Sequence, residues 1–385
     1  MNLFDVYSNE EIEIIKGRGI YIYDKYNQKY LDFYGGHAVI SIGHSHPRYV
    51  NNLKKQIKKI SFYSNSIKIP EQEKLASLLL DISGYYDYKV FLCNSGAEAN
   101  ENALKIASFH NNKKKIIAFK KSFHGRTSGA ISITDNNKII TKFNLQHKVK
   151  FIDYKNLDFL EEELKKQDIC AVISEGIQGI GGIIDPGMFV FNKIDFLCRK
   201  YNTIFIVDEI QSGYGRTGLF FAHQNSGIKP DIITIAKGMG NGFPIGGVII
   251  SPKFKPFNGM LGTTFGGNYL ACSSGISVLE IIKKECLISN AKKMGEIFIN
   301  SLKEIDEIKE IRGKGLMLGV NFNLNLNFQV KKLINFLLKK EKIFVGSSLD
   351  KNIIRLLPPL TIKEKHIKNF IIRLKKALYF LKNDK

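Results

Sequence analysis

The chain of 385 residues is 44% hydrophobic and 11% aromatic, a composition that excludes an intrinsically disordered protein. Its longest apolar runs are much shorter than a membrane span and no basic, apolar leader is visible, so we expect a cytoplasmic protein that does not enter a membrane. The net charge of +21 comes mostly from dispersed lysines, since only eight of the 57 basic residues are arginine. A surface that reads nucleic acid would need clustered arginine, so we expect no specific nucleic-acid partner.

The first elements of the chain indicate a hairpin followed by helices. Residues 19–33 alternate in the manner of two strands around a polar turn at residues 24–28. The apolar spacing then predicts helices over residues 47–59 and 71–80.

The middle of the chain alternates short apolar segments with helical ones. Helices are expected over residues 97–109, 157–166 and 191–201. The expected strands are residues 89–93, 115–119, 169–174, 203–207, 231–236 and 246–250. Short apolar strands separated by helices are typical of a mainly parallel sheet that helices cover on both faces.

After residue 269 the pattern changes to that of a smaller α+β domain. The expected helices are residues 270–283, 289–305, 329–340 and 362–381, and the strand-like pieces are residues 308–311, 316–322 and 353–357. We therefore divide the chain into an N-terminal segment, residues 1–46, that joins the small domain; a large domain, residues 47–270; and a linking helix with the C-terminal small domain, residues 271–385.

Cysteine and histidine give no sign of a metal site. The five cysteines are odd in number and show no CxxC spacing, which favours reduced and mostly buried thiols. His44 and His46 stand two residues apart, but the flanking Gly43 and Pro47 favour a turn.

A turn of small residues follows the expected strand 89–93 and opens a helix. In an open parallel sheet, ligands bind beyond the carboxyl ends of the strands. The backbone N–H groups of Gly96 and Ala97, with the Ser95 hydroxyl, would form a phosphate seat there. Taken alone, the pattern is explained more simply by an ordinary serine N-cap.

Three more strand ends carry chemically distinctive side chains. Phe123 and Arg126 flank a glycine turn, where a ring could stack on a flat cofactor and a guanidinium could bind a carboxylate, or where both could be structural. Asp208 ends an all-apolar strand, and its buried carboxylate needs a partner, either a protonated ring nitrogen or an ordinary cap or ion pair. Lys237 ends another strand before a glycine-rich loop, where a lysine can become a nucleophile.

Together these signals fit one cofactor, pyridoxal 5′-phosphate (PLP). PLP requires a lysine that binds it covalently, an acid for its ring nitrogen, a phosphate seat and a stacking wall. The Walker pattern is absent and residues 179–182 do not form a dinucleotide fingerprint, so nucleotide cofactors have no support.

The chain resembles the class III aminotransferases of PLP fold type I, and among them most closely the acetylornithine aminotransferases. The likeness runs from about residue 21 to the last helix. It is carried by the motifs at residues 94–101, 123–127, 208–218, 237–238, 262–268 and 355–360. The resemblance implies an α/β fold with a large PLP-binding domain, whose mainly parallel sheet is flanked by helices, and a smaller α+β domain from the terminal segments.

The same resemblance implies how the cofactor is held. Lys237 forms the covalent link, and Asp208 pairs with the ring nitrogen; these two are the catalytic residues. Gln211 approaches the phenolic oxygen, Phe123 stacks on the ring, and the turn at residues 95–97 holds the phosphate.

Substrate contacts and assembly are also implied. Thr263 and Arg126 contact the acylated amino acid, and Arg355 receives the α-carboxylate of glutamate or 2-oxoglutarate. Thr264 reaches the phosphate of the neighbouring subunit's cofactor, so a homodimer with shared active sites is expected.

One motif departs from the family pattern. The family has Glu-Pro-(Ile/Val)-Gln-Gly-Glu-Gly, whereas residues 175–181 read Glu-Gly-Ile-Gln-Gly-Ile-Gly. In relatives the second glutamate can mask the arginine that corresponds to Arg355. Ile180 cannot, so we hypothesise that Arg355 stays unmasked or finds another acid.

The implied reaction moves the terminal amino group of N2-acetylornithine, or a similar acylated diamino acid, to 2-oxoglutarate, in arginine synthesis, with lysine synthesis as a possible second pathway. Succinylornithine, succinyldiaminopimelate, ornithine and 4-aminobutyrate aminotransferases are the alternatives within the enzyme class. The aminomutase branch suits the pair Arg126 and Arg355 less well. From another class, an inactive polyanion-binding protein is opposed by the intact set of Lys237, Asp208, Phe123 and Arg126.

Overall fold

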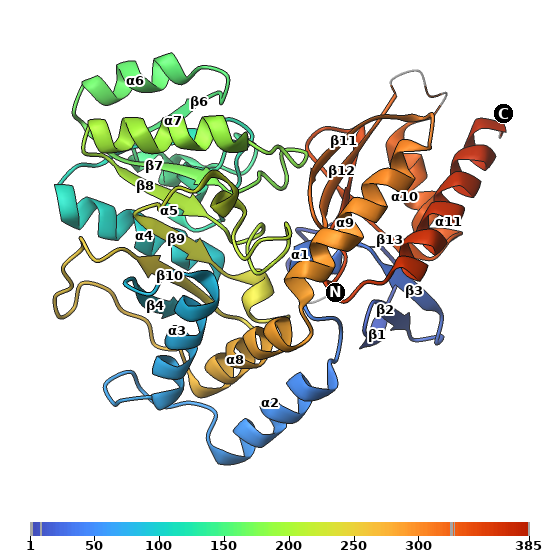
Figure 1. Ribbon diagram of the computed structural model, residues 1–385, viewed down its shortest axis with the longest axis horizontal. Helices are drawn as coiled ribbons and strands as arrows, with labels where there is room; N and C mark the ends of the chain where they lie inside the picture. The colour runs from blue at the N-terminus through green and yellow to red at the C-terminus, as the bar shows by residue number, and fades with distance from the viewer. Residues whose placement is uncertain (1–2, 8–9, 324–325, 327, 384–385) are drawn as a thin grey trace.

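The computed structural model describes residues 3–7, 10–323, 326 and 328–383, and it has two parts (Figure 1). The larger part is built on a seven-stranded sheet, and the smaller part on two four-stranded sheets. In Figure 1 the blue N-terminal strands lie beside the orange and red C-terminal elements. The α/β fold class expected from the sequence is confirmed.

The large sheet positions the strand ends that the sequence singled out. Its strands are, in spatial order, β4 (Lys89–Cys93), β10 (Gly246–Ile250), β9 (Ile232–Ile235), β8 (Ile204–Asp208), β7 (Ile169–Glu175), β5 (Lys115–Phe119) and β6 (Val149–Ile152). All neighbouring pairs are parallel except those made by β10, which is antiparallel to β4 and β9. The connection from β9 to β10 is short, which suits antiparallel pairing, whereas parallel pairs need longer crossovers. The mainly parallel sheet is confirmed, and β6 was not predicted.

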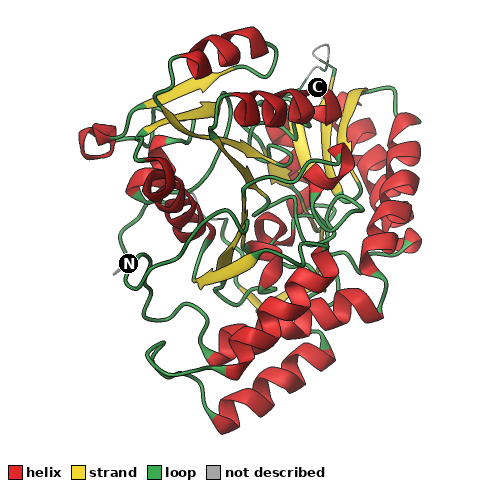
Figure 2. Ribbon diagram, turned by 60° about the vertical axis from the view of Figure 1, so that its left-hand side comes forward, coloured by secondary structure: helices red, strands yellow, loops and turns green. Residues whose placement is uncertain are grey.

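Alternate residues of the central strands face opposite helix layers, as the two-residue period of a strand requires. Ile204 and Ile206 of β8 join the apolar cluster of α4, whereas Phe205 and Val207 join that of α6 and α7. Figure 2 shows helices packed around the strands, and Figure 1 labels α4, α6 and α7 beside the sheet. The helices of this part are α2 (Pro47–Lys59), α3 (Pro70–Ser83), α4 (Gly96–Asn111), α5 (Ser128–Ser132), α6 (Leu157–Lys165) and α7 (Gly187–Lys200), with 3₁₀ turns η1 (Lys142–Gln146), η2 (Ala222–Ser226) and η3 (Lys237–Met239).

The smaller part unites the two ends of the chain. One sheet has the order β1 (Ile14–Arg18), β2 (Tyr21–Asp24), β3 (Lys29–Asp32), β13 (Ile343–Phe344), and the other β11 (Ile308–Lys314), β12 (Met317–Phe322), β15 (Ile353–Leu356), β14 (Gly346–Ser347). β2 and β3 form the expected antiparallel hairpin, and β3 pairs in parallel with β13. The hairpin therefore joins the C-terminal part, as predicted. The remaining elements are a short turn, α1 (Gly35–Ala38), and the helices α9 (Leu287–Lys303), α10 (Val330–Lys339) and α11 (Glu364–Asn383).

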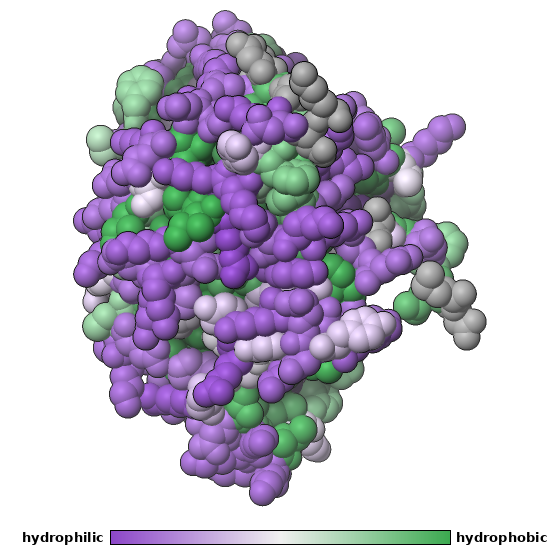
Figure 3. All heavy atoms as spheres, turned by 90° about the vertical axis from the view of Figure 1, so that its right-hand side faces the viewer, coloured by the Kyte–Doolittle hydropathy of each residue, from purple (hydrophilic) through white to green (hydrophobic). Residues whose placement is uncertain are grey.

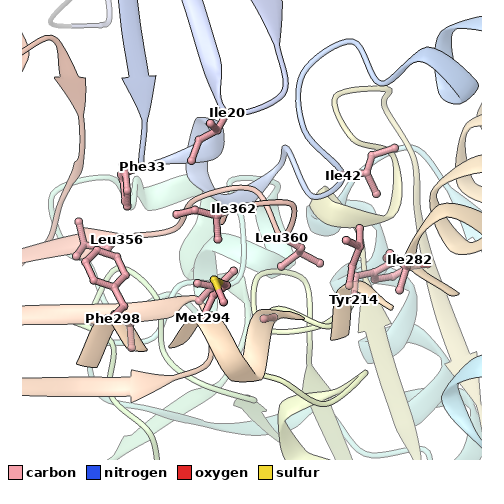
Figure 4. Close-up of a cluster of buried hydrophobic side chains, with 14 of the residues drawn as sticks. Ile20, Phe33, Ile42, Tyr214, Ile282, Met294, Phe298, Leu356, Leu360 and Ile362 are labelled. Atoms are coloured by element: carbon pink, nitrogen blue, oxygen red, sulfur yellow. The ribbon is translucent and has the colours of Figure 1, made fainter. Parts of the chain in front are cut away.

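A long helix and a shared apolar core connect the two parts. The helix α8 (Tyr269–Lys284) packs against α2 and α3 and continues into α9. Figure 4 shows Phe33 from the N-terminal segment close to Phe298 of α9, with Leu360 and Tyr214 farther along the same cluster. The domain limits at residues 46 and 270 remain a prediction.

On the face in Figure 3, hydrophilic side chains predominate, with smaller apolar patches between them. Of the helices in the described ranges, none is long and apolar enough to cross a membrane. All five cysteines are free thiols, and only Cys286 is exposed, which agrees with mostly buried, reduced thiols. His44 and His46 lie at a turn, as expected, and pair with the separate carboxylates of Asp32 and Glu285.

Candidate active site

Asp208 lies at the carboxyl end of β8 within a buried hydrogen-bond network. Its Oδ2 atom is 2.7 Å from Nδ1 of His124 and accepts a hydrogen bond of 2.8 Å from Nδ2 of Asn100. The side-chain oxygen of Asn100, Oδ1, accepts a further hydrogen bond of 2.7 Å from the Thr234 hydroxyl on β9. Three elements thus fix the carboxylate from one side, and Asp208 itself is only 4% exposed. Such a network holds a buried charge in one orientation.

The other Asp208 oxygen, Oδ1, accepts only the backbone N–H of Ile210, at 3.0 Å, among the described residues. A carboxylate oxygen has two lone-pair sites, so Oδ1 can accept another donor. Asp208 therefore accepts a local backbone N–H and pairs with the His124 ring, contacts that correspond to the two structural interpretations that its sequence left open. It also keeps the acceptor capacity that a protonated ring nitrogen requires.

Lys237 follows β9 and begins the 3₁₀ turn η3 with a left-handed backbone angle of φ 43°. Burial lowers the pKa of its ammonium, and the charge of Arg355 lowers it further, while Asp208 and Glu175 act in the opposite direction. A lysine with a lowered pKa has a larger neutral fraction and is a better nucleophile. Asp208, Glu175 and Arg355 therefore all lie near enough to Lys237 for their charges to act on its ammonium.

The turn before α4 forms the expected helix N-terminus. The Ser95 hydroxyl caps the helix, accepting a bond of 3.2 Å from the backbone N–H of Glu98. The first backbone N–H groups of the helix, at Gly96 and Ala97, have no intrahelical partner and carry a partial positive charge. A Cβ atom on Gly96 would lie 2.8 Å from the side chain of Ile210, so glycine is needed here. The turn at residues 95–97 can therefore serve as an ordinary serine N-cap and bind an anion at the same time.

Glu175, at the end of β7, supports the segment that carries Phe123. One carboxyl oxygen accepts the backbone N–H of Phe123 at 2.9 Å, and the other accepts that of Gly179 at 3.0 Å. Burial raises the pKa of Glu175 to about 7. Phe123 is half-buried, and Arg126 on the same loop is exposed.

Arg355, on β15, is 3% exposed and contacts neutral oxygens. Its Nε donates to the Ser347 carbonyl at 2.5 Å, and one Nη donates to the Tyr34 hydroxyl at 3.2 Å. Among the described residues no carboxylate lies within ion-pair distance of this guanidinium. Burial lowers its pKa. A buried cation without a counter-ion is a site for an anion.

The loop from residue 262 to 268 is less buried. The Thr263 hydroxyl accepts bonds from the backbone of Gly266, at 3.0 Å, and from the Asn94 side chain, at 3.3 Å, which places it beside the phosphate seat of its own chain. Thr264 is exposed. Gln211 donates to the His37 carbonyl at 3.0 Å.

The family model for aminotransferase class-III matches residues 5–378. The chain is a class-III aminotransferase. It is 37% identical to the acetylornithine aminotransferase of Bacillus cereus, over 98% of this chain and 97% of that protein. It is also 37% identical to the acetylornithine/succinyldiaminopimelate aminotransferase of Buchnera aphidicola, over 94% and 91%. Its structure matches the ornithine aminotransferase of Toxoplasma gondii with a TM-score of 0.91 at 30% identity, over 99% and 94%.

As a class-III aminotransferase the protein uses PLP, and the residues fit this cofactor. Asp208 offers a buried acceptor, Lys237 an amine of lowered pKa, and the N-terminus of α4 at Gly96 backbone N–H groups for a phosphate. When bound, PLP supplies an electron sink next to the substrate carbon.

Sequence reasoning missed Asn100, Thr234, Glu175 and Tyr34. Asn100 lies four residues after Gly96, so the helical period could have placed it on the same face as the phosphate seat. The others form long-range contacts that no local pattern encodes.

Proposed function

We propose that this aminotransferase transfers the terminal amino group of an acylated diamino acid, N2-acetylornithine or a close analogue, to 2-oxoglutarate. The observation that carries the proposal is the buried Arg355 guanidinium, which has neutral partners and acts electrostatically on Lys237. An α-carboxylate of glutamate or 2-oxoglutarate would supply the missing anion through a bidentate contact. The names of the relatives support the donor.

In this proposal each polar residue has a separate task. Lys237, whose pKa burial lowers, takes a proton from the substrate carbon and returns it on the cofactor side. Asp208, held by His124 and Asn100, keeps the cofactor's ring nitrogen protonated. Phe123 covers the ring, Gln211 approaches its phenolic oxygen, and the residue 95–97 turn binds the phosphate.

The donor and the second carboxylate of the acceptor meet Arg126 and Thr263. Arg126 is exposed in the single chain, and a second anchoring cation suits a dicarboxylate. We assign Thr264 to the cofactor phosphate of a second subunit, as the family resemblance implies, and its exposed side chain is compatible with that role. The protein would therefore act as a homodimer, in the cytoplasm.

Two alternatives concern the donor. The Buchnera relative bears a name with two substrates, which favours a succinylated diamino acid as a second donor. Free ornithine is favoured by Ile180, because without a glutamate at this position Arg355 would remain open to α-amino donors.

The test is a steady-state assay of glutamate formation from 2-oxoglutarate with a panel of donors at equal concentration. The proposal expects the highest kcat/KM with N-acetylornithine or N-succinylornithine. A higher value with free ornithine or 4-aminobutyrate would contradict it.

A further inference from the structure

The segment after β3 is a single left-handed turn. Four consecutive residues, from Gly35 to Ala38, have φ between 54° and 67°, and two of them are not glycine. Left-handed backbone at a residue other than glycine costs roughly 1–2 kcal/mol, and such strain clusters at functional sites. Asp32 stabilises the turn by accepting the backbone N–H groups of Tyr34 and Gly35, at 2.9 and 2.8 Å. Asp32 therefore holds the chain in this strained left-handed turn.

The turn carries the Tyr34 ring to the guanidinium of Arg355. The ring centroid lies 5.7 Å from Cζ of Arg355, and the hydroxyl accepts the bond from Nη. Gly346 is paired with Arg355 between β14 and β15, and a Cβ atom on it would lie 2.3 Å from the Tyr34 ring. The strand thus leaves a space that the ring fills. The backbone of Leu357 donates to the Phe33 carbonyl at 2.7 Å, which ties the two segments together.

His37 completes the chain of contacts. Its Nδ1 is hydrogen-bonded to the Tyr34 hydroxyl, and the two rings meet edge to face with centroids 4.7 Å apart. Because Arg355 donates to the Tyr34 oxygen, the phenolic hydrogen is free to point at Nδ1. His37 is exposed as a residue, but the partial burial of its ring, and the positive charges of Arg355 and Lys237, lower its pKa. The lowered pKa favours the neutral imidazole, which can accept the phenolic hydrogen at Nδ1.

We propose that Tyr34 and His37 are positioning residues that orient Arg355 for the carboxylate of the second substrate. The inference rests on the proposed function of Arg355. The oxygens that hold the guanidinium, from Tyr34 and Ser347, are both neutral. They fix its direction and leave its charge uncompensated for the incoming carboxylate. A glutamate at position 180 would instead neutralise it, and this chain has Ile180 there.

The first test replaces Tyr34 by phenylalanine, which keeps the ring and removes the hydroxyl. We expect KM for 2-oxoglutarate, and the dissociation constant of glutarate measured calorimetrically with the PLP-loaded enzyme, to rise about tenfold. KM for the acylated donor should stay unchanged, which a general loss of structure would not allow. Tyr26→Phe is the matched control, because Tyr26 is 80% exposed and its contacts are with Asp24 and Lys25 in the turn between β2 and β3. Equal effects on both substrates, or none, would overturn the proposal.

Two more variants test the roles of the Tyr34 ring and of the His37 imidazole separately. Gly346→Ala should displace the Tyr34 ring and reproduce the selective loss of glutarate affinity. His37→Asn keeps an acceptor and tolerates left-handed backbone, so it should bind glutarate like the parent. In the parent, affinity should fall when His37 is protonated, at a pH below the ordinary histidine value, and His37→Asn should lack that fall. Stronger glutarate binding by the parent at low pH would contradict the proposal that neutral His37 orients Arg355 through the Tyr34 hydroxyl.

Different results would contradict the proposed function and the positioning role of Tyr34. If the parent enzyme does not convert acylated diamino acids and 2-oxoglutarate, the proposed function is wrong. If it does, and Tyr34→Phe leaves the constants for 2-oxoglutarate and glutarate unchanged, the proposed function stands and the positioning role is wrong.

Discussion

His124 Nδ1 lies 2.7 Å from Asp208 Oδ2, in a pair whose side chains are 0% and 4% exposed. Hydrogen bonds to a charged group contribute roughly 1.5–3 kcal/mol, so loss of this contact should be measurable. We expect His124→Gln to lower kcat by about ten- to a hundredfold and to weaken PLP binding, because Asp208 loses its orientation. Spectroscopic titration with PLP measures the second effect. His147→Gln, at an exposed position, is the control, and equal behaviour of the two variants would contradict the role of the pair.

Lys237→Ala should abolish turnover while leaving the fold intact. The amine of lowered pKa is the nucleophile of the proposed site, and the chain offers no substitute at that strand end. Borohydride treatment of the PLP-loaded parent should attach the cofactor to the peptide that contains residue 237, as peptide mass analysis would show. Near-native activity of the variant, or cofactor on another lysine, would disprove the assignment.

Glu175 should make stability depend on pH. Its folded pKa of about 7 is raised above the ordinary 4.5 by burial, so its contribution is fully present below pH 4.5 and is lost as the pH rises through 7. The loss amounts to about 3 kcal/mol at most. Urea unfolding of the protein without PLP, between pH 5 and 8, should show a steeper fall for the parent than for Glu175→Gln. Parallel curves would indicate that Glu175 has an ordinary pKa.

Ile180→Glu should lower activity with α-amino donors relative to donors that react through the terminal amine. The new carboxylate would pair with Arg355, whose present partners are neutral. The ratio of kcat/KM for glutamate to that for N-acetylornithine measures the effect, and Ile180→Gln controls for polarity without charge. An unchanged ratio in the glutamate variant would count against masking.

A shared active site can be tested with mixed dimers of two inactive variants, Lys237→Ala and Thr264→Glu. If Thr264 serves the neighbouring subunit, each mixed dimer combines one intact Lys237 with one intact Thr264 in the same site. Random mixing should then restore about a quarter of the parent activity, since about half of the pairs are mixed and each has one intact site of two. Without sharing, mixing restores nothing.

Much of the fold followed from local pattern. The apolar spacing predicted α2 at Pro47–Lys59, and β4, β5 and β10 at their observed bounds, because each is a continuous apolar or amphipathic run. The pattern did not predict β6, the antiparallel direction of β10, or the left-handed turn at Gly35–Ala38. Strand direction depends on partners far away in the chain, and the turn is held by Asp32 against local preference.

Some residues of the candidate site could likewise be predicted from local sequence, and others could not. Strand ends located Lys237 and Asp208, because the carboxyl edge of a parallel sheet collects ligand-binding groups. Glu175 and Tyr34 act through contacts across 52 and 321 residues of sequence, which no local signal contains. For Asn100 the helical period indicates the face of α4 but not the partner Asp208, which is 108 residues away. The roles of the individual site residues remain predictions until variants are measured.

A single-turnover reaction tests the identity of the amino donor most directly. The PLP-loaded protein is mixed with one donor at a time, without 2-oxoglutarate, while the absorbance of the cofactor is followed. Suitable donors are N-acetylornithine, N-succinylornithine, N-succinyldiaminopimelate, free ornithine and 4-aminobutyrate. We predict rapid bleaching by the acylated donors alone, with their order identifying the acyl group. Equal or faster bleaching by free ornithine or 4-aminobutyrate would contradict the account.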